Sequence, residues 1–204
     1  DNLSQVYVKT GQYDKAEPLC ITATDIYKKI FGEEHIDYGI SLGNLAAITE
    51  NRGQFSRAES LYLRATAIMK TAVGETDPWY TITLGNLAGL YQKQGQYHKA
   101  EATYLLVKEI TKKTAGENSD TYATLLNNMG ILYEKMGEYN RAESLYIESG
   151  NITRTILGET HWRYGVNLNS LAVLYEITGQ YEKAEGLYLR IGTIFRSGLG
   201  ETHP

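Results

Sequence analysis

Apolar residues recur along this chain at the spacing of one face of an α-helix, and glycines interrupt that spacing at regular intervals. In one stretch, Leu87 and Tyr91 share such a face, Gly95 breaks the pattern, and Ala100 and Tyr104 resume it. Apolar positions three and four residues apart predict amphipathic helices, and an isolated glycine between them predicts a turn. The pattern therefore predicts an all-α protein made of helix pairs. In the second pair, the two helices are expected over residues 38–52 and 56–73.

A seven-residue motif returns five times, and each copy starts 42 residues after the previous one. The copies are GQYDKAE at Gly11, GQFSRAE at Gly53, GQYHKAE at Gly95, GEYNRAE at Gly137 and GQYEKAE at Gly179. A fixed period of about 20 to 50 residues is typical of stacked arrays, in which each unit buries its apolar face only against its neighbours. We therefore predict one α-solenoid over residues 1–204, and its first repeat lacks the front half of its first helix. The repeats are expected at approximately 1–35, 36–77, 78–119, 120–161 and 162–204.

Polar residues and glycines predict where the helices begin and end. Ser56 and Glu59 have the spacing of a capping box, and equivalent pairs occur in the first and fourth repeats, so the second helix of a repeat is expected to start there. Asp77 and Pro78 supply an N-cap and a first-turn proline for the first helix of the third repeat. Gly74 and its equivalents, 42 residues apart, are expected at helix C-termini.

Small and aromatic residues form columns with one member in each repeat. A column of alanines predicts helix contacts too close for a larger side chain. Two aromatic columns account for many of the tyrosines, so packing explains them without a cofactor. The three columns are Ala16, Ala58, Ala100, Ala142 and Ala184; Tyr13, Phe55, Tyr97, Tyr139 and Tyr181; and Cys20, Tyr62, Tyr104, Tyr146 and Tyr188.

The order of bulky, small and aromatic residues resembles the tetratricopeptide repeat over the entire chain. The third repeat shows it as Leu84-x2-Leu87-Ala88-x2-Tyr91 and Gly95-x-Tyr97-x2-Ala100-x3-Tyr104. The usual unit has about 34 residues, so the extra residues are expected to lengthen the second helix and its exit loop. A 42-residue unit is similar to those of kinesin light chains and of bacterial arms fused to caspase-like CHAT proteases or signalling ATPases. The resemblance implies a right-handed superhelix of stacked antiparallel helix pairs, with the first helices lining its concave surface.

One polar column lies on these first helices: Asn2, Asn44, Asn86 and Asn128, ending at Ser170 with Asn169 beside it. Asparagine is a poor residue for a helix interior, so its repetition needs a reason. Its amide both donates and accepts, as a peptide backbone does. In related repeat arms, the matching asparagines contact the backbone of a bound peptide, which the resemblance implies here for Asn2, Asn44, Asn86, Asn128 and Asn169. The alternative is that each amide bonds an adjacent helix and fixes the stacking.

Neighbouring positions are consistent with a binding groove on the same face. A glycine such as Gly85 is costly inside a helix, and either a close ligand or close helix packing would justify it. Ile82 and Ile131 are expected to form a mildly apolar floor, and Lys93 and Lys135 one edge. Glu50, Glu134 and Glu176 oppose those lysines, so an acidic ligand is only weakly favoured.

Departures from the repeat are the best candidates for specificity, because packing already explains the shared columns. Trp79 and Trp162 lie at the start of the first helices of repeats three and five, at different positions. Exposed tryptophan is a common hot-spot residue, and a plug that covers a gap between repeats is the alternative.

Composition narrows the classes of partner. The net charge is −4 and the basic residues form no run, which disfavours nucleic acid. Apolar stretches are too short for a membrane span, and the single cysteine suggests a reducing compartment, so we expect a cytoplasmic protein. The histidines lie at helix-entry positions and no HExxH or CxxC motif occurs, so we expect no enzyme activity, cofactor or metal. The sequence predicts a protein- or peptide-binding scaffold within a larger protein, and the alternative is a structural module that self-associates end to end.

Overall fold

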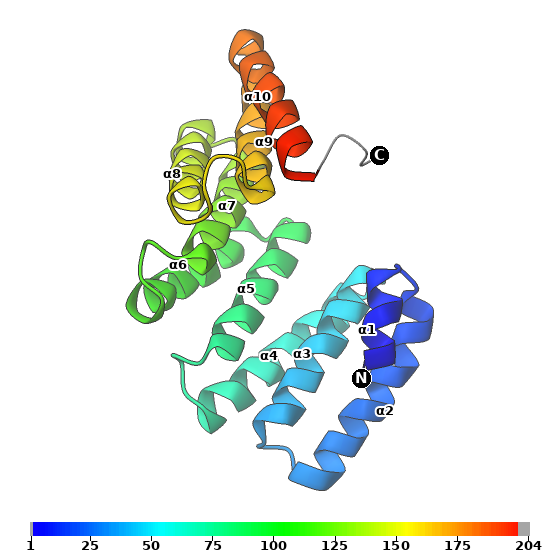
Figure 1. Ribbon diagram of the computed structural model, residues 1–204. Helices are drawn as coiled ribbons and strands as arrows, with labels where there is room; N and C mark the ends of the chain where they lie inside the picture. The colour runs from blue at the N-terminus through cyan, green and yellow to red at the C-terminus, as the bar shows by residue number, and fades with distance from the viewer. Residues whose placement is uncertain (1, 200–204) are drawn as a thin grey trace. The chain divides into compact units, whose positions relative to one another are not determined.

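The computed structural model describes residues 2–199, with the side chains of residues 3–196. Over this range the chain forms ten α-helices and no strand (Figure 1). The helices are α1 (Asn2–Lys9), α2 (Tyr13–Phe31), α3 (Ile36–Asn51), α4 (Phe55–Ala72), α5 (Pro78–Lys93), α6 (Tyr97–Thr114), α7 (Asp120–Lys135), α8 (Tyr139–Leu157), α9 (Trp162–Ile177) and α10 (Tyr181–Leu199). The predicted helices of the second pair, 38–52 and 56–73, agree with α3 and α4 to within two residues at each end.

The chain divides into two compact units, Asp1–Ile110 and Thr111–Pro204. In the first unit, α1 packs on α2, α2 on α3, α3 on α4 and α4 on α5. In the second unit, α7 packs on α8, α8 on α9 and α9 on α10. Short turns between consecutive helices that pack on each other produce antiparallel pairs. The predicted all-α fold of stacked helix pairs is confirmed, whereas the single solenoid over residues 1–204 stays a prediction.

The turn in each motif ends one helix and leads directly into the next. Gly53 has a φ of 75°, its N–H donates to the Glu50 carbonyl at 2.9 Å, and the Gln54 N–H donates to the Thr49 carbonyl at 2.9 Å. These two bonds form a Schellman motif, and its left-handed residue is favourable for glycine. α4 then begins at Phe55, with Gln54 at the N-cap and no side-chain cap bond. The predicted capping box at Ser56 is therefore wrong, because backbone bonds close this turn and Ser56 lies inside the first helical turn.

Polar side chains do cap the first helices of the pairs. Asp77, Ser119, His35 and His161 each accept a hydrogen bond from a backbone N–H in the first turn of the helix that follows. Pro78 occupies the first turn of α5, as predicted. The glycines expected at helix C-termini are confirmed by positive φ angles at Gly32, Gly74, Gly116 and Gly158. Gly200, the last of the expected C-terminal glycines, lies outside the described residues.

The alanine column lies at the closest helix contacts. Ala16, Ala58, Ala100 and Ala142 are completely buried, and Ala184 is 2% exposed. The column at Cys20, Tyr62, Tyr104 and Tyr146 is also buried, and Tyr188 is partly exposed. The aromatic column of the turns differs from the packing role that we predicted, because Tyr139 and Tyr181 are exposed and the other three members are only partly buried.

The charged residues of the motif make specific contacts with tyrosines. Arg141 lies over the ring of Tyr133 in the same repeat, with its guanidinium carbon 3.7 Å from the ring centre. Glu143 accepts a hydrogen bond of 2.7 Å from the Tyr175 hydroxyl of the next repeat. The lysine or arginine of the motif therefore braces its own repeat, and the glutamate links that repeat to its neighbour.

The link between Tyr175 and Glu143 predicts a pH dependence of stability. Burial, the hydrogen bond and the charge of Glu143 raise the pKa of Tyr175 to about 12. Because an unfolded tyrosine ionises near pH 10, this stabilisation is fully present below about pH 10 and is lost as the pH rises towards about 12. Tyr175→Phe should lower the free energy of unfolding by about 1–2 kcal/mol at neutral pH. Urea unfolding at several pH values should show that the difference shrinks in alkali, and a constant difference would contradict the assignment.

Candidate functional site

The first helices of successive pairs contact each other, α3 with α5 in the first unit and α7 with α9 in the second. The predicted asparagines lie on these helices. Asn44 on α3 and Asn128 on α7 are half-buried, and Asn86 on α5 and Asn169 on α9 are exposed. Asn2 belongs to α1, and its side chain lies outside the described side chains.

None of these four side-chain amides forms a hydrogen bond within the described part of the protein. Within residues 3–196, no hydrogen bond joins the side chain of Asn44, Asn86, Asn128 or Asn169 to another protein atom. A different asparagine, Asn167, shows what a structural role looks like, because it is buried and its Nδ2 donates to the Ser149 Oγ at 2.7 Å. No hydrogen bond therefore supports the alternative in which the asparagine column fixes the stacking.

The glycines on the first helices fall into two kinds. A Cβ added to Gly130 would lie 2.5 Å from the ring of Tyr146, so packing requires that glycine. A Cβ at Gly85 would meet no atom within 4 Å, and one at Gly43 would lie 3.6 Å from Thr83, an ordinary contact. Close packing therefore explains Gly130 but not Gly85, whose missing side chain leaves open space on the helix.

Apolar residues of the predicted groove are accessible. Ile82 is 49% exposed and Ile131 is half-buried. Trp79 and Trp162 lie in the first turns of α5 and α9 and are 46% and 49% exposed. About half of each indole is therefore exposed and could contact a ligand, and the alternative that these side chains cover gaps between repeats stays open.

Lys93, expected at one edge of the groove, is paired with one of the glutamates expected to oppose it. Its Nζ lies 2.6 Å from the Glu50 Oε1, and the Glu50 side chain is only 9% exposed. The same carboxylate accepts a hydrogen bond of 3.0 Å from the Tyr62 hydroxyl. Lys93 therefore forms an ion pair with the preceding repeat. Lys135 occupies the equivalent position, is exposed, and forms no ion pair with the described residues.

One pocket lies between α1 and α3 in the first unit and has a volume of about 230 Å³. Its lining residues are Ser4, Gln5, Val8, Lys9, Cys20, Asn44, Ala47 and Ile48. Cys20 and Val8 occupy the positions at which the next repeat has Tyr62 and Glu50. The smaller pair leaves the tyrosine's space partly unfilled. Burial raises the pKa of the Cys20 thiol, which makes it a poor nucleophile.

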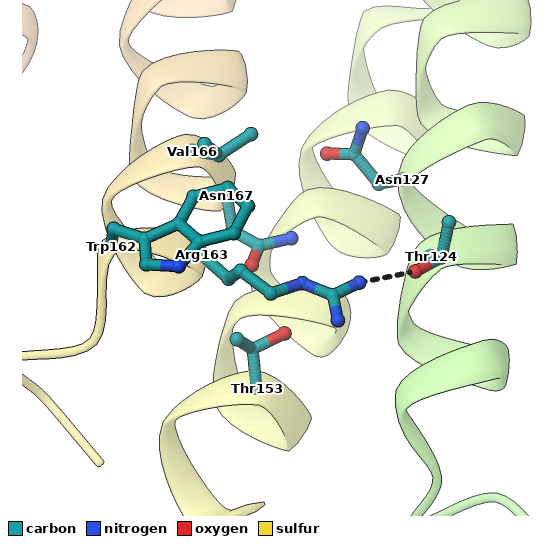
Figure 2. Close-up of a pocket in the computed structure, with 7 residues that line it drawn as sticks. All are labelled: Thr124, Asn127, Thr153, Trp162, Arg163, Val166 and Asn167. Carbon is teal, nitrogen blue, oxygen red and sulfur yellow. Dashed lines mark hydrogen bonds between the residues drawn. The ribbon is translucent and has the colours of Figure 1, made fainter. Parts of the chain in front are cut away.

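A second pocket, of about 210 Å³, lies between α7 and α9 in the second unit (Figure 2). We call it the α7–α9 pocket, and it is lined by Thr124, Asn127, Thr153, Trp162, Arg163, Val166 and Asn167. The Arg163 guanidinium lies 2.6 Å from the Asp120 Oδ2 and 3.2 Å from the Thr124 Oγ1. The one cation in this lining is therefore already paired.

Sequence reasoning missed one column that the structure exposes on the second helices of the pairs. Its five members are aliphatic, and each is at least 36% exposed. They are Ile21, Leu63, Leu105, Ile147 and Leu189. Their 42-residue spacing was visible in the sequence, but only the structure separates them from the buried columns beside them.

Neither a metal centre nor a membrane span occurs within the described part of the chain. No group of three or more histidine, cysteine, aspartate or glutamate side chains in this range is placed to hold a metal ion. Among the same residues, every helix is too short or too polar to cross a membrane.

The model of one protein family, the tetratricopeptide repeat, matches residues 1–71, 79–154 and 123–197. The chain belongs to the tetratricopeptide repeat family. These matches confirm the resemblance that the residues predicted. A search of curated proteins finds no match.

Solved structures place the same fold in other tetratricopeptide repeat proteins. BtubC (BKLC) from P. vanneervenii has a TM-score of 0.82 at 23% identity, covering 99% of this chain and 80% of that one. A putative kinesin light chain from Podosopora anserina with nearly identical TPR-like repeats has a TM-score of 0.79 at 23% identity, covering 98% and 95%. A Rap protein complexed with Competence and Sporulation Factor has a TM-score of 0.79 at 17% identity, covering 94% of this chain and 51% of that one. At these identities, the likeness concerns the fold.

Lys93 and Lys135 occupy equivalent positions, but only Lys93 forms an ion pair with the described residues, so their substitution should affect stability differently. Lys93→Met should lower the free energy of unfolding by about 0.5–1 kcal/mol at low salt, because it leaves the mostly buried Glu50 carboxylate without its cation. Added salt should reduce that difference. Lys135→Met should change stability by less than about 0.5 kcal/mol. Equal effects of the two substitutions in urea unfolding would contradict the ion pair.

Proposed function

We propose that this tetratricopeptide repeat chain holds an extended segment of a partner protein along its odd-numbered helices. Repeat scaffolds of this family are typical of protein–protein interaction and generally non-catalytic. In the proposed complex, the asparagine amides bind the backbone of the segment. We expect the chain to serve as the sensor or recruitment arm of a larger cytoplasmic protein.

The observation that carries this proposal is the set of unused amides. Asn44, Asn86 and Asn128 hold one register in successive repeats, and none bonds another described protein atom. Each amide offers donors and an acceptor that match the C=O and N–H groups of an extended chain. Because these contacts involve only backbone groups, they would hold a segment without reading its side chains.

The surroundings of the amides support the same proposal. Gly85 precedes Asn86 and leaves open space beside it, where a ligand backbone could approach. Trp79 and Ile82 expose apolar surface on the same helix. Tryptophan is enriched among the residues that dominate binding energy at protein interfaces.

A structural neighbour gives independent support. The Rap protein of similar fold was solved complexed with Competence and Sporulation Factor. A scaffold of this fold can therefore hold a ligand, and we extend that capacity to this chain. End-to-end self-association stays an alternative expectation, which sedimentation of the purified chain over a range of concentrations would measure.

Loss of two amides should weaken peptide binding. A peptide-display selection on the immobilised chain should enrich binding peptides. Asn86→Ala with Asn128→Ala should lower the affinity for these peptides at least about tenfold, since each lost hydrogen bond contributes about 1 kcal/mol. Titration calorimetry with an enriched peptide gives the ratio.

A matched control distinguishes the loss of groove asparagines from the loss of any two exposed asparagines. Asn140→Ala with Asn151→Ala removes two exposed asparagines of α8, a second helix of a pair, and should leave the affinity unchanged. All three proteins should melt alike. An empty selection, or equal losses in both double variants, would overturn the proposed groove.

Gly85 should show a conflict between stability and binding. Gly85→Ala should stabilise the protein by about 0.5–1 kcal/mol, because alanine is the better helix former and its Cβ meets no neighbour. The same methyl group should lower the affinity for an enriched peptide, because it occupies the space beside Asn86. As the contrasting control, Gly130→Ala should destabilise the protein, since its Cβ would clash with Tyr146. Tighter peptide binding by Gly85→Ala would contradict a close backbone approach.

A further inference from the structure

The α7–α9 pocket exists at a departure from the repeat. Thr153 in its wall stands where Met69 stands in the first unit, 84 residues earlier. Met69 is 1% exposed, and its sulfur accepts a hydrogen bond of 3.4 Å from Thr83. Replacing a methionine by a threonine removes side-chain volume, and the cavity of about 210 Å³ opens at that place.

The lining is also more polar than its counterpart in the first unit. Asn127 stands where Gly43 stands, and Thr124 where Ile40 stands. The Asn127 Oδ1 is buried and has no hydrogen-bond partner within the described part of the chain. In Figure 2, this oxygen points from α7 towards α9, across the pocket. A buried carbonyl oxygen without a donor is costly, and a donor supplied by a ligand would remove that cost.

Three other polar side chains of the pocket, Asn167, Arg163 and Thr124, are already engaged. The Asn167 Nδ2 donates to the Ser149 Oγ, and the Ser149 hydroxyl donates to the Ala123 carbonyl at 2.7 Å. Arg163 is paired with Asp120 and also bonds the Thr124 hydroxyl. The pocket therefore has no net charge to offer and one oxygen that needs an N–H or O–H group.

We propose that the α7–α9 pocket binds the side-chain amide of an asparagine or glutamine in the partner segment. The amide N–H₂ donates to the Asn127 Oδ1, and its carbonyl faces the Thr153 hydroxyl. The exposed faces of Trp162 and Val166 cover the methylene groups of the ligand. This subsite rests on the proposed function, since it selects one side chain of the segment that the asparagine column holds.

Other side chains fit these contacts less well. A carboxylate would face the Asn127 oxygen with acceptors only, and the paired Arg163 gives it no free cation. An apolar side chain of the same size would leave the buried oxygen unsatisfied, and a site built to bond a polar group rejects analogues that lack it. An amide both donates and accepts, which the pocket requires.

Single-residue probes test the subsite directly. N-acetylglutamine N-methylamide and N-acetylasparagine N-methylamide are titrated against N-acetylleucine and N-acetylaspartate N-methylamides by nitrogen–proton NMR. The two tryptophans, one in each unit, give two indole signals. We expect an amide probe to shift the Trp162 signal with a dissociation constant about fivefold or more below those of the leucine and aspartate probes, and the Trp79 signal not to move in parallel.

Three variants test whether the preference for an amide probe depends on the Asn127 oxygen and on the small side chain of Thr153. Asn127→Ala should reduce the amide preference to less than about twofold, because the orphan oxygen is gone. Asn151→Ala is the matched control, because it removes an exposed asparagine of α8 that does not line the pocket, and it should keep the full preference. Thr153→Met restores the residue of the first unit and should abolish the Trp162 shift by filling the cavity. Melting temperatures confirm that each variant folds.

Three results would overturn the subsite: equal binding of the leucine probe, absence of any Trp162 shift, or a full amide preference in Asn127→Ala. The display selection tests peptide binding along the whole face, whereas these probes report at Trp162 alone. Failure of the subsite can therefore be told apart from failure of the proposed function, because enriched peptides without a preferred asparagine or glutamine would overturn only the subsite.

Discussion

Within the second unit, a hydrogen bond from a tyrosine of one repeat to the motif glutamate of the repeat before it links successive helix pairs beside a buried alanine. Tyr175 and Glu143 show it directly, and the neighbouring Ala142 is completely buried. The alanine lets two helices approach closely, and the hydroxyl can reach the carboxylate only when they do. Where Thr49 replaces the tyrosine, Glu17 instead binds Arg52 and Arg57, so the glutamate keeps its function with new partners. In the second unit, the proposed binding face depends on this geometry, because α7 and α9 lie in contact there.

Two pockets lined by described residues lie where a column of the repeat loses volume. In the first unit, Cys20 and Val8 replace a tyrosine and its carboxylate partner, and a largely apolar cavity results. In the second unit, Thr153 replaces a methionine beside Asn127, and the cavity is more polar. The departures from the repeat are therefore the places where chemistry differs, whereas the shared columns produce the same packing everywhere.

The period and the helical pattern were enough to predict the helices, the Asp77 cap and the buried alanine column, because each depends on contacts that recur in every repeat. The sequence placed Glu50 opposite Lys93, but the direct pairing of these two residues, 43 positions apart, depends on which helices touch. Arg163 and Asp120 are also 43 residues apart, so opposite charges one residue beyond the period carried a signal that the sequence reasoning did not use. The capping box at Ser56 was wrong because backbone bonds, which leave no mark in side-chain patterns, close the turn. The α7–α9 pocket depends on the volume of Thr153 against its neighbours, which only packing reveals.

Backbone contacts that repeat with a fixed period do not define the register of a bound segment, and the α7–α9 pocket can define it. In the proposed complex, the equivalent amides at Asn44, Asn86 and Asn128 would bind any extended backbone alike, so they would give a bound segment little preference for one register over a shifted one. A shifted segment keeps its backbone bonds but moves its side chains to other positions on the face. One subsite that accepts a single kind of side chain removes that degeneracy, because only one register then satisfies the Asn127 oxygen. In this arrangement the repeated residues supply affinity, and the departures from the repeat supply register and specificity.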